Sequence, residues 1–143
     1  MHIILFTDSI PTEIFEGVQQ VHQAVFSGDL LKQEKLNRKK LIALVAIIEE
    51  QVVGFKFGYE HPDGAFYSWL GGVHPSFQRQ GIAQKLIEDQ HQFVKEKGYT
   101  LIRTYSRNEK MAMLLLNLRN GFLVHSTFID EKGIHKIVLE KNI

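Results

Sequence analysis

The stretch Val73–Leu86, VHPSFQRQGIAQKL, decides how this sequence is interpreted, because its second half has the apolar spacing of a helix but an unusual first turn. The N-terminus of a helix carries a partial positive charge and favours acidic side chains. Here the first turn contains Arg79 and then Gly81, and a glycine inside a helix costs about 1 kcal/mol relative to alanine. The stretch predicts a helix over about 78–97 whose first turn serves something other than helix stability.

The residues alone leave two interpretations of this first turn open. Free N–H groups at a helix N-terminus bind anions, Gly81 would let phosphate oxygens reach the backbone, and Arg79 would add charge. Alternatively, Gly81 is a packing glycine and residues 78–80 are merely exposed. The missing additional glycines exclude a Walker loop and a dinucleotide-binding fingerprint.

The rest of the chain alternates apolar runs with turn signals. Short β-branched and apolar runs predict strands at residues 2–7, 41–48, 52–59, 65–73, 99–105, 122–128 and 134–140. Helical spacing predicts a helix from about Pro11 to Val25, a weaker one over 28–40 and a largely buried one from the N-cap Asn108 to Arg119. We expect residues 41–73 to form an antiparallel meander. This order predicts an α/β fold, a mixed sheet with helices on its faces.

Composition excludes several classes of function. The 143 residues suit one domain, and the formal charge of +1 gives no general attraction to nucleic acid or to anionic membranes. The basic run from Lys32 to Lys40 is short and fits a solvated helix face. No cysteine is present and the histidines lack ligand spacing, so we expect no metal site. No signal peptide or membrane span is recognisable, and we expect a cytoplasmic protein.

Two segments carry a resemblance to a known family. Gln78–Ala83, QRQGIA, resembles the Gln/Arg-x-x-Gly-x-Gly/Ala signature of the GNAT superfamily of acetyl-CoA-dependent N-acetyltransferases. Asn108, Ala112, Asn117 and Asn120–Phe122 resemble the later family segment, and the order of elements also matches. The resemblance implies one N-acetyltransferase domain over residues 1–143. It also implies a central, mostly antiparallel sheet with splayed strands, flanked by helices.

The resemblance further implies where acetyl-CoA, the expected co-substrate, would bind. Backbone amides of the signature would hold its pyrophosphate, the main chain near Gly72 and Val73 would pair with the pantetheine arm, and the later segment would line the far side. The implied cofactor-binding residues are Gly72, Val73, Gln78, Arg79, Gln80, Gly81, Ile82, Ala83, Asn108, Ala112 and Asn117.

One departure from the family pattern concerns catalysis. Asn117 stands where the family often has a tyrosine that protonates the departing thiolate, and an amide can only donate a hydrogen bond. Either another group is the acid, or the thiolate leaves unprotonated, since a thiol pKa of roughly 8.5 makes it a tolerable leaving group. The catalytic candidates are Glu60, Tyr67 and Asn117, with His61, Tyr105 and His125 as further possible bases.

The acceptor pocket is expected beside the strand 65–73. Alternation places Tyr67 and Trp69 on one face of this strand and Phe66, Ser68 and Leu70 on the other. Phe26, Tyr59, Tyr67 and Trp69 are the candidate substrate-binding residues.

The sequence therefore predicts transfer of an acetyl group from acetyl-CoA to a primary amine of a small molecule or peptide. The expected mechanism is direct attack in a ternary complex. The alternative is a non-catalytic acyl-CoA sensor or interaction module on the same fold, motivated by Asn117 and by the absence of an obvious base. Neither nucleic acid nor membrane is expected as a partner, and a homodimer is compatible with the sequence.

Overall fold

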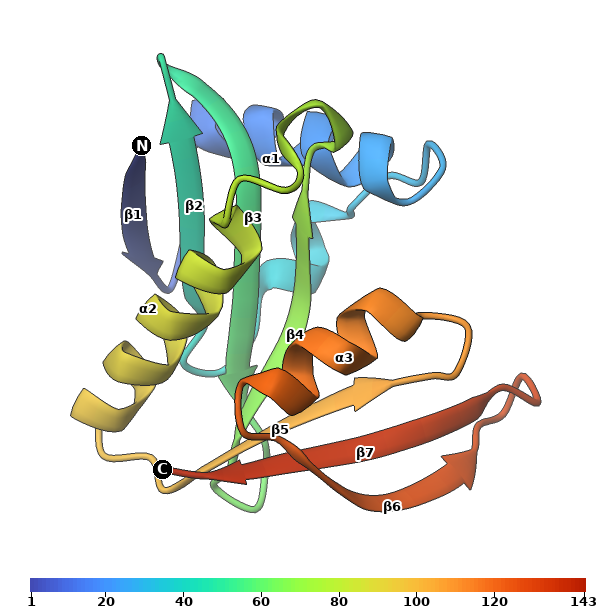
Figure 1. The fold of residues 1–143 in the computed structure, drawn as a ribbon. Coiled ribbons are helices and arrows are strands. Elements are labelled where there is room, and N and C mark those ends of the chain that lie inside the picture. The colour runs from blue at the N-terminus through green and yellow to red at the C-terminus, as the bar shows by residue number, and fades with distance from the viewer.

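The computed structural model describes residues 1–143 and shows a mixed α/β fold built on one seven-stranded sheet (Figure 1). In chain order the elements are β1 (His2–Thr7), α1 (Thr12–Val25), the 3-10 turn η1 (Gln33–Leu36), β2 (Ile42–Ile48), β3 (Gln51–Glu60), β4 (Phe66–Val73), the 3-10 turn η2 (Pro75–Phe77), α2 (Ile82–Glu96), β5 (Leu101–Ser106), α3 (Met111–Arg119), β6 (Leu123–Ile129) and β7 (His135–Asn142). The strands lie in the order β1-β2-β3-β4-β5-β7-β6. None of the helices has the length and apolarity needed to cross a membrane.

The sheet is mixed because its central neighbours, β4 and β5, run parallel, whereas the other neighbouring strands are antiparallel. β4 and β5 pair only at Phe66–Ile102 and Tyr67–Arg103, and then diverge (Figure 1). At the point of divergence the Thr104 hydroxyl donates a 2.9 Å hydrogen bond to the carbonyl of Ser68. The two strands are therefore splayed toward the carboxyl end of β4, and a side chain replaces the backbone ladder where the gap begins.

Helix α1 covers one face of the sheet, and helices α2 and α3 cover the other (Figure 1). On the first face, Val18 and Val21 of α1 pack with Phe55 and Phe57 of β3. On the second face, Leu86 belongs to a separate cluster with residues of β2 and β3. Apolar residues at the helical period fill both layers, so the sheet is buried between them.

Residues 28–40 do not form the second helix that the sequence predicted. Only the single 3-10 turn η1 is present, and its buried residue is Leu36. The segment has too few apolar anchors to hold a helix against the sheet, and its backbone polar groups instead bond to α1, as in the hydrogen bonds between Gln19 and Leu31. The basic run is thus part of an extended crossover segment rather than a helix face.

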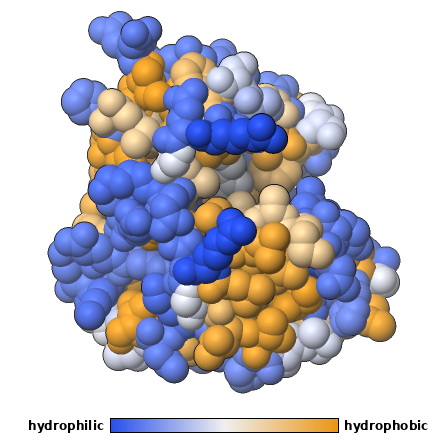
Figure 2. All heavy atoms as spheres, viewed as in Figure 1, coloured by the Kyte–Doolittle hydropathy of each residue, from blue (hydrophilic) through white to orange (hydrophobic).

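Helix α3 is less buried than the sequence predicted. It begins at Met111 with Lys110 as the N-cap, not at Asn108, and Asn117 is its only buried residue. Its apolar residues occupy all sides, so their pattern could not indicate which side faces the protein. Figure 2 shows apolar side chains gathered on the outer surface in this region, where the exposed apolar residues of α3 are Met111, Met113, Leu115 and Leu118.

A β-bulge in β4 changes which side chains share a face. Leu70 lies opposite Phe57 and Ser68 lies opposite Gly58, so Trp69 is an extra residue without a partner in β3. Leu70 therefore packs on the α1 face together with Trp69. The prediction that Leu70 shares a face with Phe66 and Ser68 was wrong, because simple alternation cannot anticipate the extra residue.

Candidate functional site

A large cleft opens where β4 and β5 diverge, with a volume of about 1280 Å³. The carboxyl-terminal half of β4 forms one wall and the end of β5 forms another. The first turns of α2, the inner side of α3 and the turn between β6 and β7 complete it. Segments that are far apart in the sequence thus meet around the gap between the two splayed strands.

The first turn of α2 borders this cleft and is open to a ligand. Gly81 is the N-cap, in the left-handed conformation with φ 77°, and no side chain caps the helix or places an acid in its first turn. A Cβ atom built on Gly81 would meet nothing within 4 Å, so Gly81 is not a packing glycine. Its role is conformational, because a positive φ favours glycine, and it leaves the amides that follow without partners.

Most of the residues predicted to bind a cofactor lie along the cleft. Those that line it are Gly72, Val73, Gln78, Arg79, Gly81, Ile82, Ala83, Ala112 and Asn117. Gln80 and Asn108 are exposed in turns outside the lining residues. Arg79 itself has φ 62°, so the loop makes a second left-handed turn just before Gly81.

The inner wall of the cleft carries polar groups without protein partners. Asn117 is only 4% exposed and faces the cleft from α3, and Ser106 at the end of β5 has a buried hydroxyl with no hydrogen-bond partner. Lys56 of β3 also lines the cleft, and burial lowers the pKa of its ammonium to about 8. Of these three groups, only the Ser106 hydroxyl is fully buried without a partner. Such groups are rare in proteins, so its place on the cleft wall indicates a polar ligand.

The cleft continues through the gap to the α1 face. Phe26 at the end of α1, Trp69 and Leu70 line the same cavity as Asn117, although they belong to opposite faces of the sheet. The β4 bulge lies at this crossing, and the amide of an extra bulge residue is free of the strand ladder. A molecule in the cleft is therefore accessible from both sides of the sheet.

An aromatic cluster occupies the α1 face beside this opening. Tyr59 contacts Tyr67 with ring centroids 5.3 Å apart and Trp69 at 5.6 Å, and Tyr67 contacts Tyr105 at 5.1 Å. The guanidinium of Arg38 lies over the Tyr59 and Trp69 rings, 5.0 and 5.6 Å from their centroids. Trp69 and Tyr105 line the cleft, whereas Tyr59 and Tyr67 form the layer behind them.

Glu60, a predicted catalytic residue, does not line the cleft. Its carboxylate lies 3.1 Å from Lys39 and 3.4 Å from Lys40 and accepts a hydrogen bond from Tyr99, beside a separate hollow. The hydrogen bond from Lys39 is the main reason why the pKa of Glu60 is lowered. An ion-paired carboxylate outside the cleft is not placed to accept a proton from a substrate.

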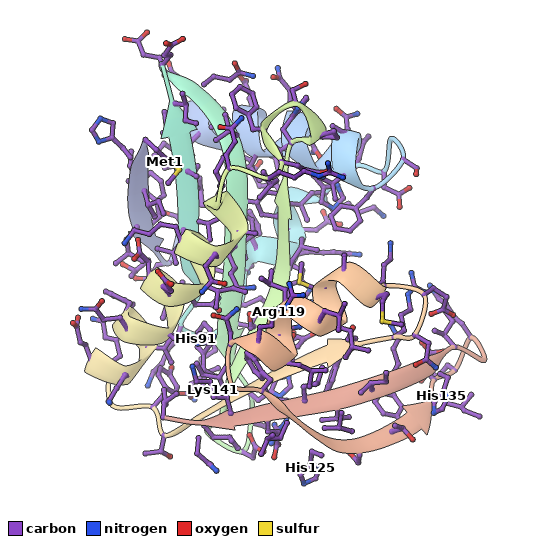
Figure 3. The ribbon with its side chains drawn as sticks, in the orientation of Figure 1. Met1, His91, Arg119, His125, His135 and Lys141 are labelled. Atoms are coloured by element: carbon purple, nitrogen blue, oxygen red, sulfur yellow. The ribbon has the colours of Figure 1, made fainter.

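The other acid–base candidates are also engaged elsewhere. His61 stacks on Tyr67 and lies 3.1 Å from Arg103, and burial lowers its pKa. Burial likewise raises the pKa of Tyr67 above its usual value, so its hydroxyl stays protonated. His125 lies on β6, points away from the cleft and is 60% exposed (Figure 3).

Sequence reasoning missed a clamp that joins the two helices of the cleft. The Gln84 side chain of α2 and the Asn120 side chain after α3 exchange two hydrogen bonds, of 2.8 and 2.9 Å. Asn120 also donates to the carbonyl of Leu116. In the sequence Asn120 belongs to the segment 120–122 that resembles the family, and no signal in either residue indicates that they pair. A second missed residue is Lys56, which the sequence showed only as part of a strand.

Comparison with solved structures identifies the fold as that of N-acetyltransferases. Aminoglycoside 6′-acetyltransferase type Ii matches with a TM-score of 0.84 and 16% identity, over 99% of this chain and 97% of that one. The ribosomal-protein-S18-alanine N-acetyltransferase of Escherichia coli matches with a TM-score of 0.76 and 16% identity, over 98% and 94%. An Elizabethkingia anophelis GNAT acetyltransferase with acetyl-CoA bound matches with a TM-score of 0.75 and 17% identity, over 99% and 98%.

Residues 39–123 match the family described as "Acetyltransferase (GNAT) domain". The chain therefore belongs to the GNAT acetyltransferase family and is an acetyl-CoA-dependent N-acyltransferase, which confirms the resemblance seen in its sequence. A search of the curated proteins finds no match to this sequence. No group of three or more His, Asp or Glu side chains is close enough to hold a metal ion.

Proposed function

We propose that this protein transfers the acetyl group of acetyl-CoA directly to a primary amine of a small molecule or peptide. The observation that carries this proposal is that the cleft passes through the sheet. The open first turn of α2 lies on one face, and the aromatic cluster lies on the other. A donor held on the first face and an amine held on the second would meet at the β4 bulge, and such proximity supplies much of the rate of a two-substrate reaction.

The chain's own residues fit coenzyme A. The amides from Arg79 to Ala83 would bind its pyrophosphate, because the uncapped helix start and the left-handed Gly81 leave them free. The main chain at Gly72 and Val73, on the side where β5 diverges, would pair with the pantetheine arm. Asn117 and Ser106 would satisfy polar groups along that arm. When bound, acetyl-CoA supplies an acetyl group activated as a thioester.

The β4 bulge would stabilise the negative charge that develops during transfer. Trp69 has no partner in β3, and Leu70 resumes the pairing. A main-chain N–H at this bulge is rigidly held and already free, which are the properties of an oxyanion donor. The backbone near Leu70 is therefore the proposed donor to the oxyanion.

On the α1 face, Phe26 and Trp69 would contact the acceptor directly, with Tyr59 and Tyr67 supporting them. The only carboxylates that line the cleft are Asp130 and Glu131, in the turn between β6 and β7. Asp130 accepts hydrogen bonds from the amides of Lys132 and Ile134, so it stabilises the turn. We propose that the amine reaches the site in its neutral form. After it attacks the acetyl carbon, its nitrogen releases the extra proton to water rather than to a dedicated base.

Calorimetric titration with acetyl-CoA tests the cofactor site. Gly81→Asp should abolish binding, because it places a negative charge beside the pyrophosphate amides. Gly98→Asp is a matched control: Gly98 also has a positive φ and also has nothing within 4 Å of an added Cβ, but it lies at the other end of α2. Equal loss of binding in both variants, or retained binding in Gly81→Asp, would contradict the proposed site.

Release of free thiol tests the reaction. Wild-type protein with acetyl-CoA is assayed against a panel of amines that includes aliphatic, aromatic and peptide amines. Turnover with any of them supports acetyl transfer to an amine. Tight binding of acetyl-CoA without turnover of any amine would instead support the sensor alternative.

A further inference from the structure

Lys56 lies against a glycine of the neighbouring strand, and its side chain lines the cleft. It lies on β3 directly opposite Gly71 of β4, and its Cγ atom lies 3.5 Å from the position that a Cβ of residue 71 would occupy. Gly54, two residues earlier on β3, faces Ile82 and Leu86 of α2, so alternation places Lys56 on the α2 face as well. Its stem thus crosses β4 over Gly71, and the residue lines the cleft.

The ammonium of Lys56 has no counter-ion in the protein. Burial is the only cause that lowers its pKa to about 8, and no carboxylate or hydrogen-bond acceptor raises it again. Lys56 is half-buried, and a partly desolvated cation without a partner contributes little to stability. The position of Lys56 therefore indicates an interaction with a group that enters the cleft.

The sulfur of a bound coenzyme would be the group in the cleft that needs a proton when the acetyl group leaves it. Asn117, on the opposite wall, stands where the family often has a tyrosine acid, and its amide cannot release a proton. Tyr105 also lines the cleft, but its contacts with Tyr67 and Phe128 place its ring in the aromatic cluster on the acceptor side. Lys56 lines the same cleft from the α2 face of β3, the face on which the coenzyme is proposed to bind.

We propose that the Lys56 ammonium is the acid that stabilises and protonates the departing thiolate of coenzyme A, an inference that rests on the proposed function. In this step a bond forms between the acceptor nitrogen and the acetyl carbon, and the bond between that carbon and sulfur breaks. The electron pair of the broken bond goes to sulfur, which receives a proton from Lys56. The acceptor nitrogen releases its extra proton to water, and water reprotonates Lys56.

The charged surroundings of Lys56 are mostly positive or neutral, which favours an anion beside it. His91 of α2 is close enough for the charge of Lys56 to act on it, and burial is the main cause that lowers the pKa of His91 to about 3, so it is neutral. Lys141 of β7 lies behind His91, at 3.0 Å from its ring nitrogen (Figure 3). Lysine loses its acidic proton above its pKa, so turnover should decline above about pH 8. The charged residues that line the rest of the cleft are Arg79, Arg107, Lys110, Asp130, Glu131, Lys132 and Lys136.

The test measures the bound thiol itself, in addition to turnover. Free coenzyme A is bound to wild-type protein, to Lys56→Met and to Lys95→Met, whose lysine is exposed near the end of α2. The ultraviolet absorbance of the thiolate is followed across pH. We expect the thiol pKa in the wild-type and Lys95→Met complexes to lie at least about one unit below its value in the Lys56→Met complex. We also expect Lys56→Met to lower kcat about 100-fold, with binding of the coenzyme retained.

Two further measurements keep this inference separate from the proposed function. Lys56→Gln repeats the test with a polar side chain in case the methionine variant does not fold. Lys56→Arg keeps the positive charge, so the thiol pKa of bound coenzyme A should stay lowered. Because arginine does not lose its proton near pH 8, the decline in kcat above pH 8 should disappear. If wild-type protein turns over an amine while Lys56→Met and Lys56→Gln keep both the lowered thiol pKa and kcat, the role of Lys56 is overturned and the acetyltransferase function stands. If wild-type protein binds no acetyl-CoA, both proposals fail.

Discussion

Gly71 of β4 leaves the space that the stem of Lys56 occupies: the two residues are paired across β3 and β4, and the Lys56 Cγ atom lies 3.5 Å from where a side chain at 71 would begin. Gly71 is followed by a second glycine, Gly72. The structure gives the two glycines different neighbours. An added Cβ at Gly71 would meet β3, whereas one at Gly72 would meet Val25 of α1.

Gly71→Val should displace Lys56 from the cleft. Its Cβ would lie 3.1 Å from the Phe55 carbonyl and would compete with the lysine stem for the same space. We expect the free energy of unfolding to fall by about 1–3 kcal/mol and the thiol pKa of bound coenzyme A to return to the value seen in Lys56→Met. Urea unfolding and thiolate absorbance measure the two effects.

Gly72→Ala provides the comparison for this variant. Its added Cβ would lie 3.1 Å from a methyl group of Val25, on the opposite face of the sheet from Lys56. It should therefore lose stability without changing the thiol pKa. A thiol pKa that changes equally in both variants would show that crowding of β4, rather than Lys56, controls the sulfur.

Tyr67 and Trp69 should differ in their effect on catalysis. Burial keeps the Tyr67 hydroxyl protonated by raising its pKa, so it cannot act as a base near neutral pH. Tyr67→Phe retains the ring that stacks on His61, and kcat should remain within about threefold of wild type. Trp69→Ala removes a wall of the cleft, and we expect KM for the acceptor amine to rise while the Kd for acetyl-CoA is retained. A kcat for Tyr67→Phe reduced by about 100-fold or more would restore Tyr67 as a catalytic residue.

The clamp between Gln84 and Asn120 should couple α2 to α3 energetically. Asn120→Ala removes both hydrogen bonds to Gln84 and the one to Leu116, and we expect a loss of about 1–3 kcal/mol in the free energy of unfolding. A double-mutant cycle with Gln84→Ala should give a coupling energy of at least about 0.5 kcal/mol. Gln92→Ala, which breaks only an exposed contact with Glu96 along α2, should change stability by less than about 0.5 kcal/mol. If the losses in free energy of unfolding from Gln84→Ala and Asn120→Ala simply add in the double variant, the two side chains are not energetically coupled.

The sequence predicted the strands and the cleft-forming elements well, because each has a local signal. Apolar and β-branched runs mark β2 and β3, and the unusual first turn before Ile82 marks the end of α2 that borders the cleft. Prediction from the sequence failed where contacts between distant segments determine which side chains are buried. The bulge at Trp69 changes the face of Leu70, and the burial of α3 depends on which elements lie beneath it.

In the candidate site, too, some residues can be predicted from their neighbours in the sequence and others only from the fold. Gly81 could be interpreted from its neighbours in the chain, since helix starts and glycines have local rules. Lys56 and Glu60 are both charged residues on β3, and nothing local distinguishes them. Only the fold places Lys56 in the cleft and gives Glu60 its lysine partners outside it. Contacts between residues that are distant in the sequence therefore determine which charged side chain can reach a ligand in the cleft.

His91 should make the protein less stable in acid. Its ring is 8% exposed and one ring nitrogen accepts a hydrogen bond from Lys141, so the folded state holds the neutral form. Burial is the main cause that lowers the pKa of His91 to about 3, whereas an unfolded histidine has a pKa of about 6.5. Between these values the unfolded state binds the proton and the folded state does not. The contribution of His91 to the free energy of unfolding is therefore fully present above about pH 6.5. Below that pH it falls by up to about 1.4 kcal/mol for each pH unit.

His91→Gln removes the titrating group but keeps a side chain that can accept from Lys141. Its free energy of unfolding, measured in urea between about pH 7 and pH 4, should fall less steeply than that of wild type. The control is His125→Gln, which changes an exposed histidine on β6, away from His91 and Lys141 (Figure 3). This control should keep the slope of the wild type. Identical slopes in His91→Gln and wild type would mean that His91 accepts a proton in the folded state, and that Lys141 and the surrounding apolar contacts can accommodate its charge.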